Sequence, residues 1–397
     1  MLTLTRKKDM YIYIIAFFAV SLNLRIGITS ISPVLEIIRH DLHLSNFIVS
    51  FLPSIPVLCM GIFALFTGYV TEKWGAEKAI AGCLLLIGGA TFIRGIAYYT
   101  WVLLITSLLI GIGIALAGSL LSGVIKKKYP SKIGVMIGIY SVGMGLGASL
   151  SAGLTIDLQQ LFNQSWNHAL AVWGILAILA FLLWSYAIKG GKEQKETLNV
   201  AVKLPFKNKK AWAITIFFGI QSGIFYSATT WIASIAQSMG FTGKEAGTIV
   251  TVLAFIQMTC SFFVPILVDY LQNRNLFIYI SAFLTFIGLL LLAFGLASPW
   301  ISAILIGVGI GGLFPIALML PLNKTETAED ASAWTALMQL GGYLLGGILP
   351  IVLGLIRDVA NTDTHVFLVL VLLSLMLIPL SLYIGRDKKS TEMAHAS

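Results

Sequence analysis

Long, continuous apolar segments constrain the fold of this chain more than any other feature. A helix that crosses a bilayer needs about 20 mostly apolar residues. The long runs here are continuous rather than alternating, which is typical of membrane helices and not of a membrane barrel. The sequence therefore predicts an all-α integral membrane protein with twelve transmembrane helices, at residues 10–38, 47–70, 79–99, 101–125, 133–156, 167–188, 211–239, 242–269, 276–296, 298–322, 333–356 and 365–385.

Composition and the placement of charge support this class. The chain is 58% hydrophobic and 11% charged, whereas an average soluble domain carries about a quarter charged residues. The net charge of +9 does not indicate a nucleic-acid partner, because the lysines stand in short loops between apolar segments. On one side of the predicted membrane the loops hold only Arg39, Lys244 and Arg357, and the other loops hold many more cations. This asymmetry predicts a multi-pass protein of the cytoplasmic (inner) membrane with both termini in the cytoplasm.

One substantial polar linker, "KGGKEQKETLNVAVKLPFKNKK" at 189–210, separates the first six spans from the last six. We therefore predict an N-terminal six-helix bundle at 1–188 and a C-terminal six-helix bundle at 211–397. The two halves also share a pattern in their fourth spans: "ITSLLIGIGIALAG" begins at Ile105 and "ISAILIGVGIGGLF" begins at Ile301. Glycine-rich membrane helices also match by chance, since small residues pack such helices. The equivalent placement favours duplication, and two six-span repeats around a central site are a transporter architecture.

Arg25 lies in the middle of the first apolar run. With Ser21, Thr29 and Ser32 it forms a polar stripe at helical spacing, which predicts that this face points into the bundle or into a wet cavity. A buried cation needs a partner, yet no Asp or Glu falls near the middle of any span. The partner is then either a small anionic substrate, which also explains the missing acid, or backbone carbonyls at a broken helix together with water.

Arg94 stands only four residues before the aromatic cluster Tyr98, Tyr99 and Trp101, which marks a membrane interface. Long cationic side chains near such an interface extend toward water. We therefore expect Arg94 to reach the outer surface rather than to bind substrate.

Spans 7 and 11 carry a second group of polar and aromatic residues. These amides and aromatic side chains require partners when buried. For any one of them a helix–helix hydrogen bond explains the residue as well as a ligand contact does. As a group they form a candidate wall opposite Arg25 and Thr29, and they are Gln221, Tyr226, Trp231, Gln339 and Tyr343.

The loop "GYVTEKWGAEK" at 68–78 joins spans 2 and 3. Gly68, Glu72, Lys73 and Gly75 fit the spacing G-x-x-x-[DE]-[RK]-x-G of the loop that marks the major facilitator superfamily, although an ordinary charged turn has the same composition. We expect a gating latch here, in which acid and base pair in one state only. The equivalent loop, "VDYLQNRN", keeps Asp269 and Arg274 but lacks the glycines.

Four segments together resemble the cyanate permease and nitroimidazole transporter family of that superfamily: "NLRIGITSISPVL", "IKKKYPSKIGVMIGIYSVGMGLGASLSAGL", "GIQSGIFYSATTWI" and "MQLGGYLLGGILP". The resemblance covers nearly the whole chain. It implies two six-helix bundles that move a small solute, often anionic or planar, by alternating access. The family's binding residues match Arg25, Gln221, Tyr226, Gln339 and Tyr343. A departure stands near the end of span 5, where family members often have a proline and this chain has Asp157.

We therefore expect a secondary active or facilitative transporter of a small, cyanate-like or other small organic or inorganic anion. The alternatives are a multidrug or neutral-solute efflux transporter of the same superfamily and, outside this class, a non-transporting receptor. An enzyme is disfavoured because the five histidines lie in or next to loops: His40, His43, His168, His365 and His395. We expect a monomer whose partners are the substrate and the lipid bilayer, with no cofactor and no metal site. Without an acid at the membrane midplane, we also expect no proton carrier there.

Overall fold

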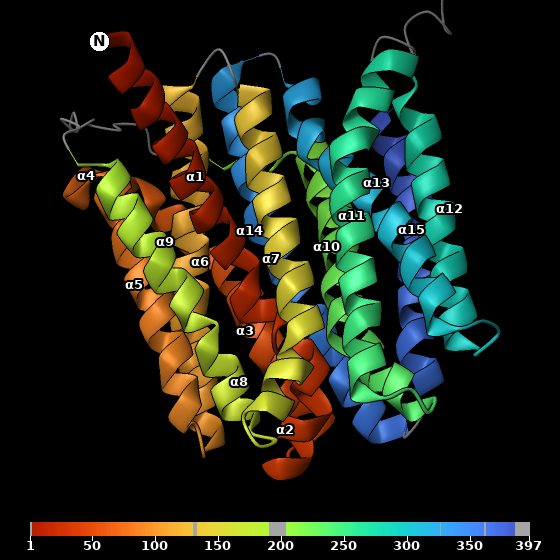
Figure 1. The fold of residues 1–397 in the computed structure, drawn as a ribbon. Helices are drawn as coiled ribbons and strands as arrows, with labels where there is room; N and C mark the ends of the chain where they lie inside the picture. The colour runs from red at the N-terminus through yellow and green to blue at the C-terminus, as the bar shows by residue number, and fades with distance from the viewer. Residues whose placement is uncertain (1, 130–132, 190–203, 326, 361–362, 386–397) are drawn as a thin grey trace, which may run out of the picture.

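The computed structural model describes residues 2–129, 133–189, 204–325, 327–360 and 363–385. Nearly all of them are helical (Figure 1). The predicted linker lies largely at 190–203, outside the described residues. The elements are α1 (Leu2–Thr29), η1 (Ser32–Val34), α2 (Leu35–Asp41), α3 (Asn46–Phe63), η2 (Ala64–Phe66), α4 (Thr67–Trp74), α5 (Ala76–Ile93), η3 (Arg94–Ile96), α6 (Thr100–Lys128), α7 (Ile133–Leu161), α8 (Trp166–Val172), α9 (Gly174–Ala187), α10 (Lys209–Ser238), α11 (Gly243–Leu271), α12 (Arg274–Ala293), α13 (Pro299–Lys324), α14 (Ala328–Ala360) and α15 (Asp363–Gly385).

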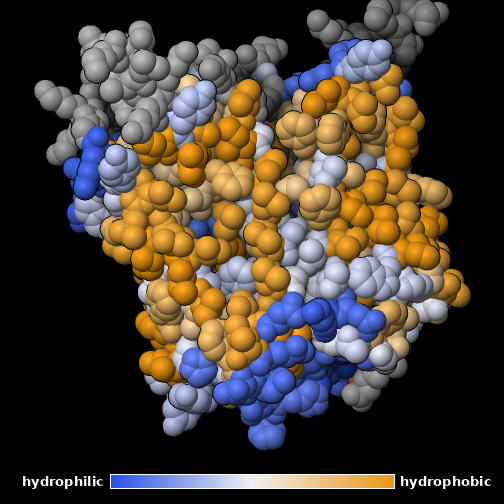
Figure 2. Space-filling model, in the orientation of Figure 1, coloured by the Kyte–Doolittle hydropathy of each residue, from blue (hydrophilic) through white to orange (hydrophobic). Residues whose placement is uncertain are grey.

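The prediction of twelve membrane spans is confirmed: within the described residues twelve helical segments are long and apolar enough to cross a bilayer. Their ends lie within a few residues of the predicted ones. Four spans combine several elements, because span 1 is α1, η1 and α2, span 2 is α3, η2 and α4, span 3 is α5 and η3, and span 6 is α8 and α9. Apolar side chains cover the middle of the molecule and hydrophilic ones gather at the end that holds α2 (Figure 2).

Local sequence explains where the helices begin and bend. Asn208 precedes α10, and its side chain accepts from the backbone N–H groups of the first turn. Thr242 and Glu245 form a reciprocal capping box at the start of α11. Between α4 and α5, Gly75 has φ 78° and ψ 149°, a left-handed conformation that other residues rarely adopt. The signature glycine of the loop therefore makes the turn that joins spans 2 and 3.

The repeat seen in the sequence is also a repeat in packing. Gly111 of α6 lies against Pro56 and Cys59 of α3, and Gly113 lies against Cys83 and Ile87 of α5. The equivalent glycines of α13 contact the equivalent helices, Gly307 against α11 and Gly309 against α12. Span 4 thus packs on spans 2 and 3 as span 10 packs on spans 8 and 9. The chain forms two pseudo-symmetric six-helix bundles, as predicted.

The two bundles meet along two helix pairs. In the N-terminal bundle α3 packs on α14 of the other bundle, and α7 packs on α11. The pseudo-symmetry relates span 2 to span 8 and span 5 to span 11, so it converts one of these pairs into the other. Beside these pairs α1 packs on α7 and α10 packs on α14, so the first spans of the two halves take equivalent places.

Candidate functional site

Arg25 is buried at the contact between the two bundles. Its side chain is 8% exposed, and Nη1 donates to the Tyr226 hydroxyl of α10 at 2.9 Å. The guanidinium carbon lies 5.1 Å from the ring centre of Phe225 and 5.3 Å from that of Tyr226. Aromatic faces attract a cation at such distances. The expectation that span 7 forms a wall opposite Arg25 therefore agrees with this geometry.

No carboxylate in the described part of the chain forms an ion pair with Arg25. The nearest polar groups are neutral, and a phenol hydroxyl and aromatic faces leave the positive charge uncompensated. A guanidinium presents several N–H donors in one plane, which suits the oxygen atoms of a planar anion. The site therefore has the charge and the donor geometry to bind a small anion.

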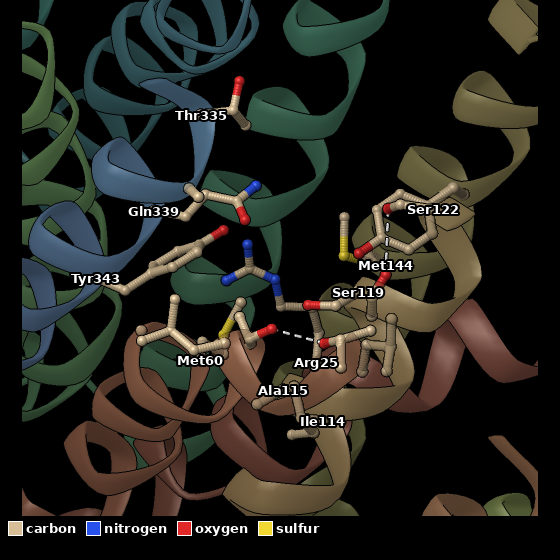
Figure 3. Close-up of a pocket in the computed structure, with 18 residues that line it drawn as sticks. Arg25, Met60, Ile114, Ala115, Ser119, Ser122, Met144, Thr335, Gln339 and Tyr343 are labelled. Atoms are coloured by element: carbon tan, nitrogen blue, oxygen red, sulfur yellow. Dashed lines mark hydrogen bonds between the residues drawn. The ribbon is translucent and has the colours of Figure 1, made fainter. Parts of the chain in front are cut away.

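A cavity of about 320 Å³ extends from Arg25 toward one face of the molecule. Figure 3 shows the guanidinium projecting between Tyr343 and Gln339 on one side and Ser119 and Met144 on the other. Farther along, the cavity is lined by Thr67 at the start of α4, Ser122 near the end of α6 and Thr335 near the start of α14. These ends of α4, α6 and α14 lie toward the end of the molecule that holds the N-terminus (Figure 1). Arg25 is thus approached from that face.

On the opposite face, three side chains join the two bundles, and we call Glu36, Ser234 and Arg357 the Glu36 cluster. One carboxylate oxygen of Glu36 accepts from Arg357 Nη1 at 2.8 Å and from the Ser234 hydroxyl. The other oxygen accepts from Arg39 Nε at 2.7 Å. The side chains of Glu36 and Arg357 are only 14% and 13% exposed. Because Glu36 belongs to α2 and its two partners belong to α10 and α14, the cluster ties the bundles together.

Further contacts join the bundles on this side. The Asp358 carboxylate of α14 accepts from the backbone N–H groups of Asn46 and Phe47 at 2.9 and 2.8 Å. It therefore caps the first turn of α3, where a negative charge is favourable. Closer to Arg25, the Ser32 hydroxyl donates to the Thr229 carbonyl of α10. Hydrogen bonds thus join the two bundles between Arg25 and this face. Between Arg25 and the opposite face, the cavity separates the bundles.

The residues predicted to bind substrate separate into two groups. Gln221, Tyr226 and Tyr343 surround Arg25 in a small enclosed space, and Gln339 lines the larger cavity beside Tyr343. Thr29 is turned away: its hydroxyl lies 2.6 Å from that of Ser151 on α7.

Trp231 is also apart from the cavity. It is fully buried, its Nε1 donates to the Pro350 carbonyl at 3.2 Å, and its ring lies 5.2 Å beneath the Arg357 guanidinium. Its contacts are with the Glu36 cluster rather than with Arg25.

The predicted gating residues lie at the face where the cavity opens. Glu72 and Lys73 are exposed on α4, and Lys73 Nζ lies 5.6 Å from the ring centre of Trp74. Within the described residues, neither Glu72 nor Asp269 forms an ion pair. Gly68 has open space around its α-carbon, and Arg274 begins α12. The predicted pairing of acid and base in this latch is therefore not seen among the described residues.

The expectation for Arg94 was wrong. Its side chain is 1% exposed and does not reach the surface. Nη1 donates to the Gly27 carbonyl at 3.2 Å and Nη2 donates to the Ser107 hydroxyl at 3.0 Å. The short distance along the sequence from Tyr98 and Trp101 indicated that Arg94 lies near the membrane interface, but it did not indicate the direction of the side chain. That side chain points inward between α1 and α6.

Sequence reasoning also missed the Glu36 cluster. Glu36 lies near the end of the first span, where a charge is unremarkable at a membrane interface. Its partner Arg357 is 321 residues away, so no spacing rule connects the two. The available signal was weak: Arg357 is one of only three basic residues in the sparsely charged loops.

Comparison with known proteins agrees with the fold and the resemblance. A model of the Major Facilitator Superfamily matches residues 12–350. The chain is 33% identical to "Uncharacterized transporter YycB" of Bacillus subtilis (strain 168), over 93% of this chain and 92% of that protein. It is 25% identical to "Cyanate transport protein CynX" of Escherichia coli (strain K12), over 86% and 89%, and 26% identical to the "2-nitroimidazole transporter" of the same organism, over 96% and 97%.

A solved structure shows the same fold. The structure described as a D-xylose-proton symporter superposes with a TM-score of 0.77 at 15% identity, covering 95% of this chain and 98% of that chain. At this identity the likeness concerns the fold alone. With the family match across most of the sequence and the twelve spans of the described residues, this chain belongs to the Major Facilitator Superfamily and is a multi-pass membrane transporter.

Proposed function

We propose that this transporter moves a small, planar anion and that Arg25 binds its negative charge. The observation that carries the proposal is a buried guanidinium at the end of a cavity, with no carboxylate partner in the described residues. A charge held in this way is costly unless a ligand compensates it. The name of one relative, a cyanate transport protein, supports a small anion, and the name of another, a 2-nitroimidazole transporter, supports a planar solute.

The surroundings of Arg25 favour a planar ligand. Phe225 and Tyr226 lie against the guanidinium. Tyr343 lines the same space, and Gln221 and Gln339 provide amide groups that donate as well as accept. An anion of a few atoms has room to accept from the guanidinium while its faces contact the aromatic rings. This arrangement suits a bound ligand, and with the family match it favours a transporter over an enzyme.

Transport in this proposal follows alternating access. The bundles at 1–188 and 211–397, joined by the linker at 189–210, act as the two moving bodies. The face where the cavity opens is the cytoplasmic one, where both termini lie, because the basic loops gather there. The Glu36 cluster then closes the outer side, and Gly68, Glu72, Lys73, Gly75, Asp269 and Arg274 act at the inner side when that side closes. The moving unit is a monomer in the cytoplasmic membrane.

Binding of small anions to the purified protein tests the proposal. Thermal unfolding in detergent is followed with nitrite, nitrate, cyanate, formate and acetate, at constant ionic strength and with chloride as the reference. A ligand present at about 100 times its dissociation constant stabilises the folded state by about 2.7 kcal/mol. We expect at least one planar anion to raise the unfolding temperature of the wild type and to have no such effect on Arg25→Ala.

Two results contradict the proposal. One is that no anion stabilises the wild type. The other is that Arg25→Ala is stabilised as much as the wild type by the same anion. A neutral compound, 2-nitroimidazole, is measured beside the anions because the mostly apolar lining of the cavity, with Met60, Ile114 and Met144, also suits a neutral planar solute. Stabilisation by this compound alone, unchanged in Arg25→Ala, favours the neutral-solute alternative.

A further inference from the structure

The first membrane span breaks directly after Arg25. The helix α1 ends at Thr29, and η1 follows with Pro33, which has no N–H to donate to the carbonyl of Thr29. Across the break, backbone hydrogen bonds run from Ser30 N to the Ile26 carbonyl and from Val34 N to the Ile31 carbonyl. Neither reaches the carbonyl of Gly27. This carbonyl is one of the end groups of a helix that need a donor from elsewhere.

Arg94 supplies that donor from the neighbouring span. It begins η3, at the end of α5, and its Nη1 lies 3.2 Å from the Gly27 carbonyl oxygen. Its Nη2 is held by Ser107 of α6 at 3.0 Å. Among the described atoms its Nε is buried without a hydrogen-bond partner, and no described carboxylate pairs with Arg94. An ion pair therefore does not explain why this cation is buried here.

The end of α1 explains it better. The C-terminal end of a helix carries partial negative charge, so a guanidinium is stabilised there. The same turn of α1 is also in close contact with α6, because a β-carbon added at Gly27 would lie 2.6 Å from Cγ2 of Ile110. Steric contact at Gly27 sets how closely α1 approaches α6. The bond from Arg94 restrains the end of α1 on the surface of α6.

We infer that Arg94 is a positioning residue for Arg25. Gly27 is two residues beyond Arg25 in the same helical turn, so restraint of the Gly27 carbonyl restrains the guanidinium that reaches Tyr226 across the interface. The break leaves the Gly27 carbonyl without a backbone donor among the described residues, and the Arg94 side chain supplies one. This inference rests on the proposed function, in which Arg25 binds the substrate.

Hydrogen exchange tests the restraint without any ligand. We compare the wild type with Arg94→Gln, which loses the charge, and with Arg94→Lys, which keeps the charge but not the fork. Thr91→Val is the matched control: Thr91 is also buried on α5, but its hydroxyl bonds to the Ile87 carbonyl of its own helix. In Arg94→Gln we expect amides between residues 27 and 31 to exchange about tenfold faster, as loss of a charged hydrogen bond predicts, with α10 unchanged.

In Arg94→Lys we expect the exchange rate between residues 27 and 31 to be intermediate between those of Arg94→Gln and the wild type. If Arg94→Gln does not fold, Arg94→Lys is compared with the wild type instead. Exchange between residues 27 and 31 that matches the wild type in every folded Arg94 variant overturns the inference. So does an equal acceleration in Thr91→Val, because the effect is then general loosening of α5.

Anion binding separates this inference from the proposed function. The probe is nitrite, nitrate or cyanate, whichever stabilises the wild type most. We expect Arg94→Gln to weaken its dissociation constant about tenfold, while Thr91→Val keeps the wild-type value. If Arg25→Ala abolishes binding and Arg94→Gln binds like the wild type, the positioning role is overturned and the proposed function stands. If Arg25→Ala binds normally, or no anion binds, the proposed function fails, and the exchange measurement alone decides whether Arg94 restrains α1.

Discussion

Arg25 and Tyr226 form the contact on which the proposed binding site depends. The arginine comes from the first span of one bundle and the tyrosine from the first span of the other, and the bond between them is 2.9 Å long. The Tyr226 hydroxyl also lies 3.8 Å from the sulfur of Met60. A neutral phenol orients the guanidinium without neutralising it, which leaves the charge for an anion.

The first prediction concerns this hydroxyl. Tyr226→Phe keeps the ring beneath the guanidinium but removes the hydrogen-bond acceptor, and a bond to a charged group contributes about 1.5 to 3 kcal/mol. We expect anion affinity to fall at least about tenfold, measured by titration of the purified protein. Tyr140→Phe is the matched control, because Tyr140 lines the same cavity and no described bond joins it to Arg25. Equal affinities of Tyr226→Phe and the wild type would refute a role for this hydroxyl.

At the residue scale, the sequence predicted how deep a residue lies in its span better than it predicted the direction in which the side chain points. Helical periodicity predicted that the face of Arg25 points inward, whereas the wall of Gln221, Tyr226 and Tyr343 was expected from the polar residues of spans 7 and 11 and from the family resemblance. The side chain of Arg94 was assigned the wrong direction, because its position is decided by a helix break in another span. The Glu36–Arg357 pair was not predictable from spacing, since it joins helices of different bundles.

At the scale of elements, the first spans of the two bundles differ although they occupy equivalent places. Span 7 is one continuous helix, α10, from Lys209 to Ser238. Span 1 is interrupted between Thr29 and Ser32, and Pro33 prevents the helix from continuing with normal bonds. Breaks of this kind place irregular backbone where it lines a site. The interruption separates Arg25 in α1 from Glu36 in α2.

The second prediction concerns the Glu36 cluster. Glu36→Gln keeps the size of the side chain but removes the charge that Arg357 contacts, so the outer contact should open more often. We expect a cysteine placed at Ser32, which is buried beside the contact, to react about tenfold faster with a thiol reagent. The measurement uses a variant whose native cysteines are replaced by alanine.

Its matched control is Asp157→Asn. Asp157 pairs with Lys244 at 2.8 Å and also joins the two bundles on this face, but the side chains of Lys244 and Asp157 are 63% and 39% exposed. Exposed pairs contribute little, so we expect the labelling rate to stay near that of the parent. An unchanged rate in Glu36→Gln contradicts the closing role of the cluster.

At the scale of the whole molecule, the cavity and the contacts between the bundles lie on opposite sides of Arg25. The cavity reaches the end that holds α4, and the Glu36 cluster lies at the other end. The number and order of the spans were predictable because each apolar segment is long enough to cross the bilayer as a helix, and a helix makes its backbone hydrogen bonds within the segment. The side on which the cavity opens was not predictable from the sequence, because it depends on contacts between residues hundreds of positions apart.

The third prediction concerns the driving force. Spans without a midplane acid lack the usual proton carrier, so we expect one negative charge to move without a coupled proton. A potential of 100 mV is worth about 2.3 kcal/mol per charge, a bias of about fifty-fold in the gradient. In proteoliposomes a positive lumen should therefore accumulate the anion. Accumulation driven by a pH gradient at zero potential would instead require proton coupling.

The central claim is that Arg25 binds a transported anion, and uptake into proteoliposomes tests it most directly. Wild type, Arg25→Lys and Arg25→Ala are reconstituted in equal folded amounts, and entry of the anion that best stabilises the wild type is measured at a fixed potential. We expect saturable uptake by the wild type, strongly reduced uptake by Arg25→Lys because a point charge does not replace the planar fork, and no uptake by Arg25→Ala above empty vesicles. Uptake by Arg25→Ala at the wild-type rate would show that Arg25 does not bind the transported anion.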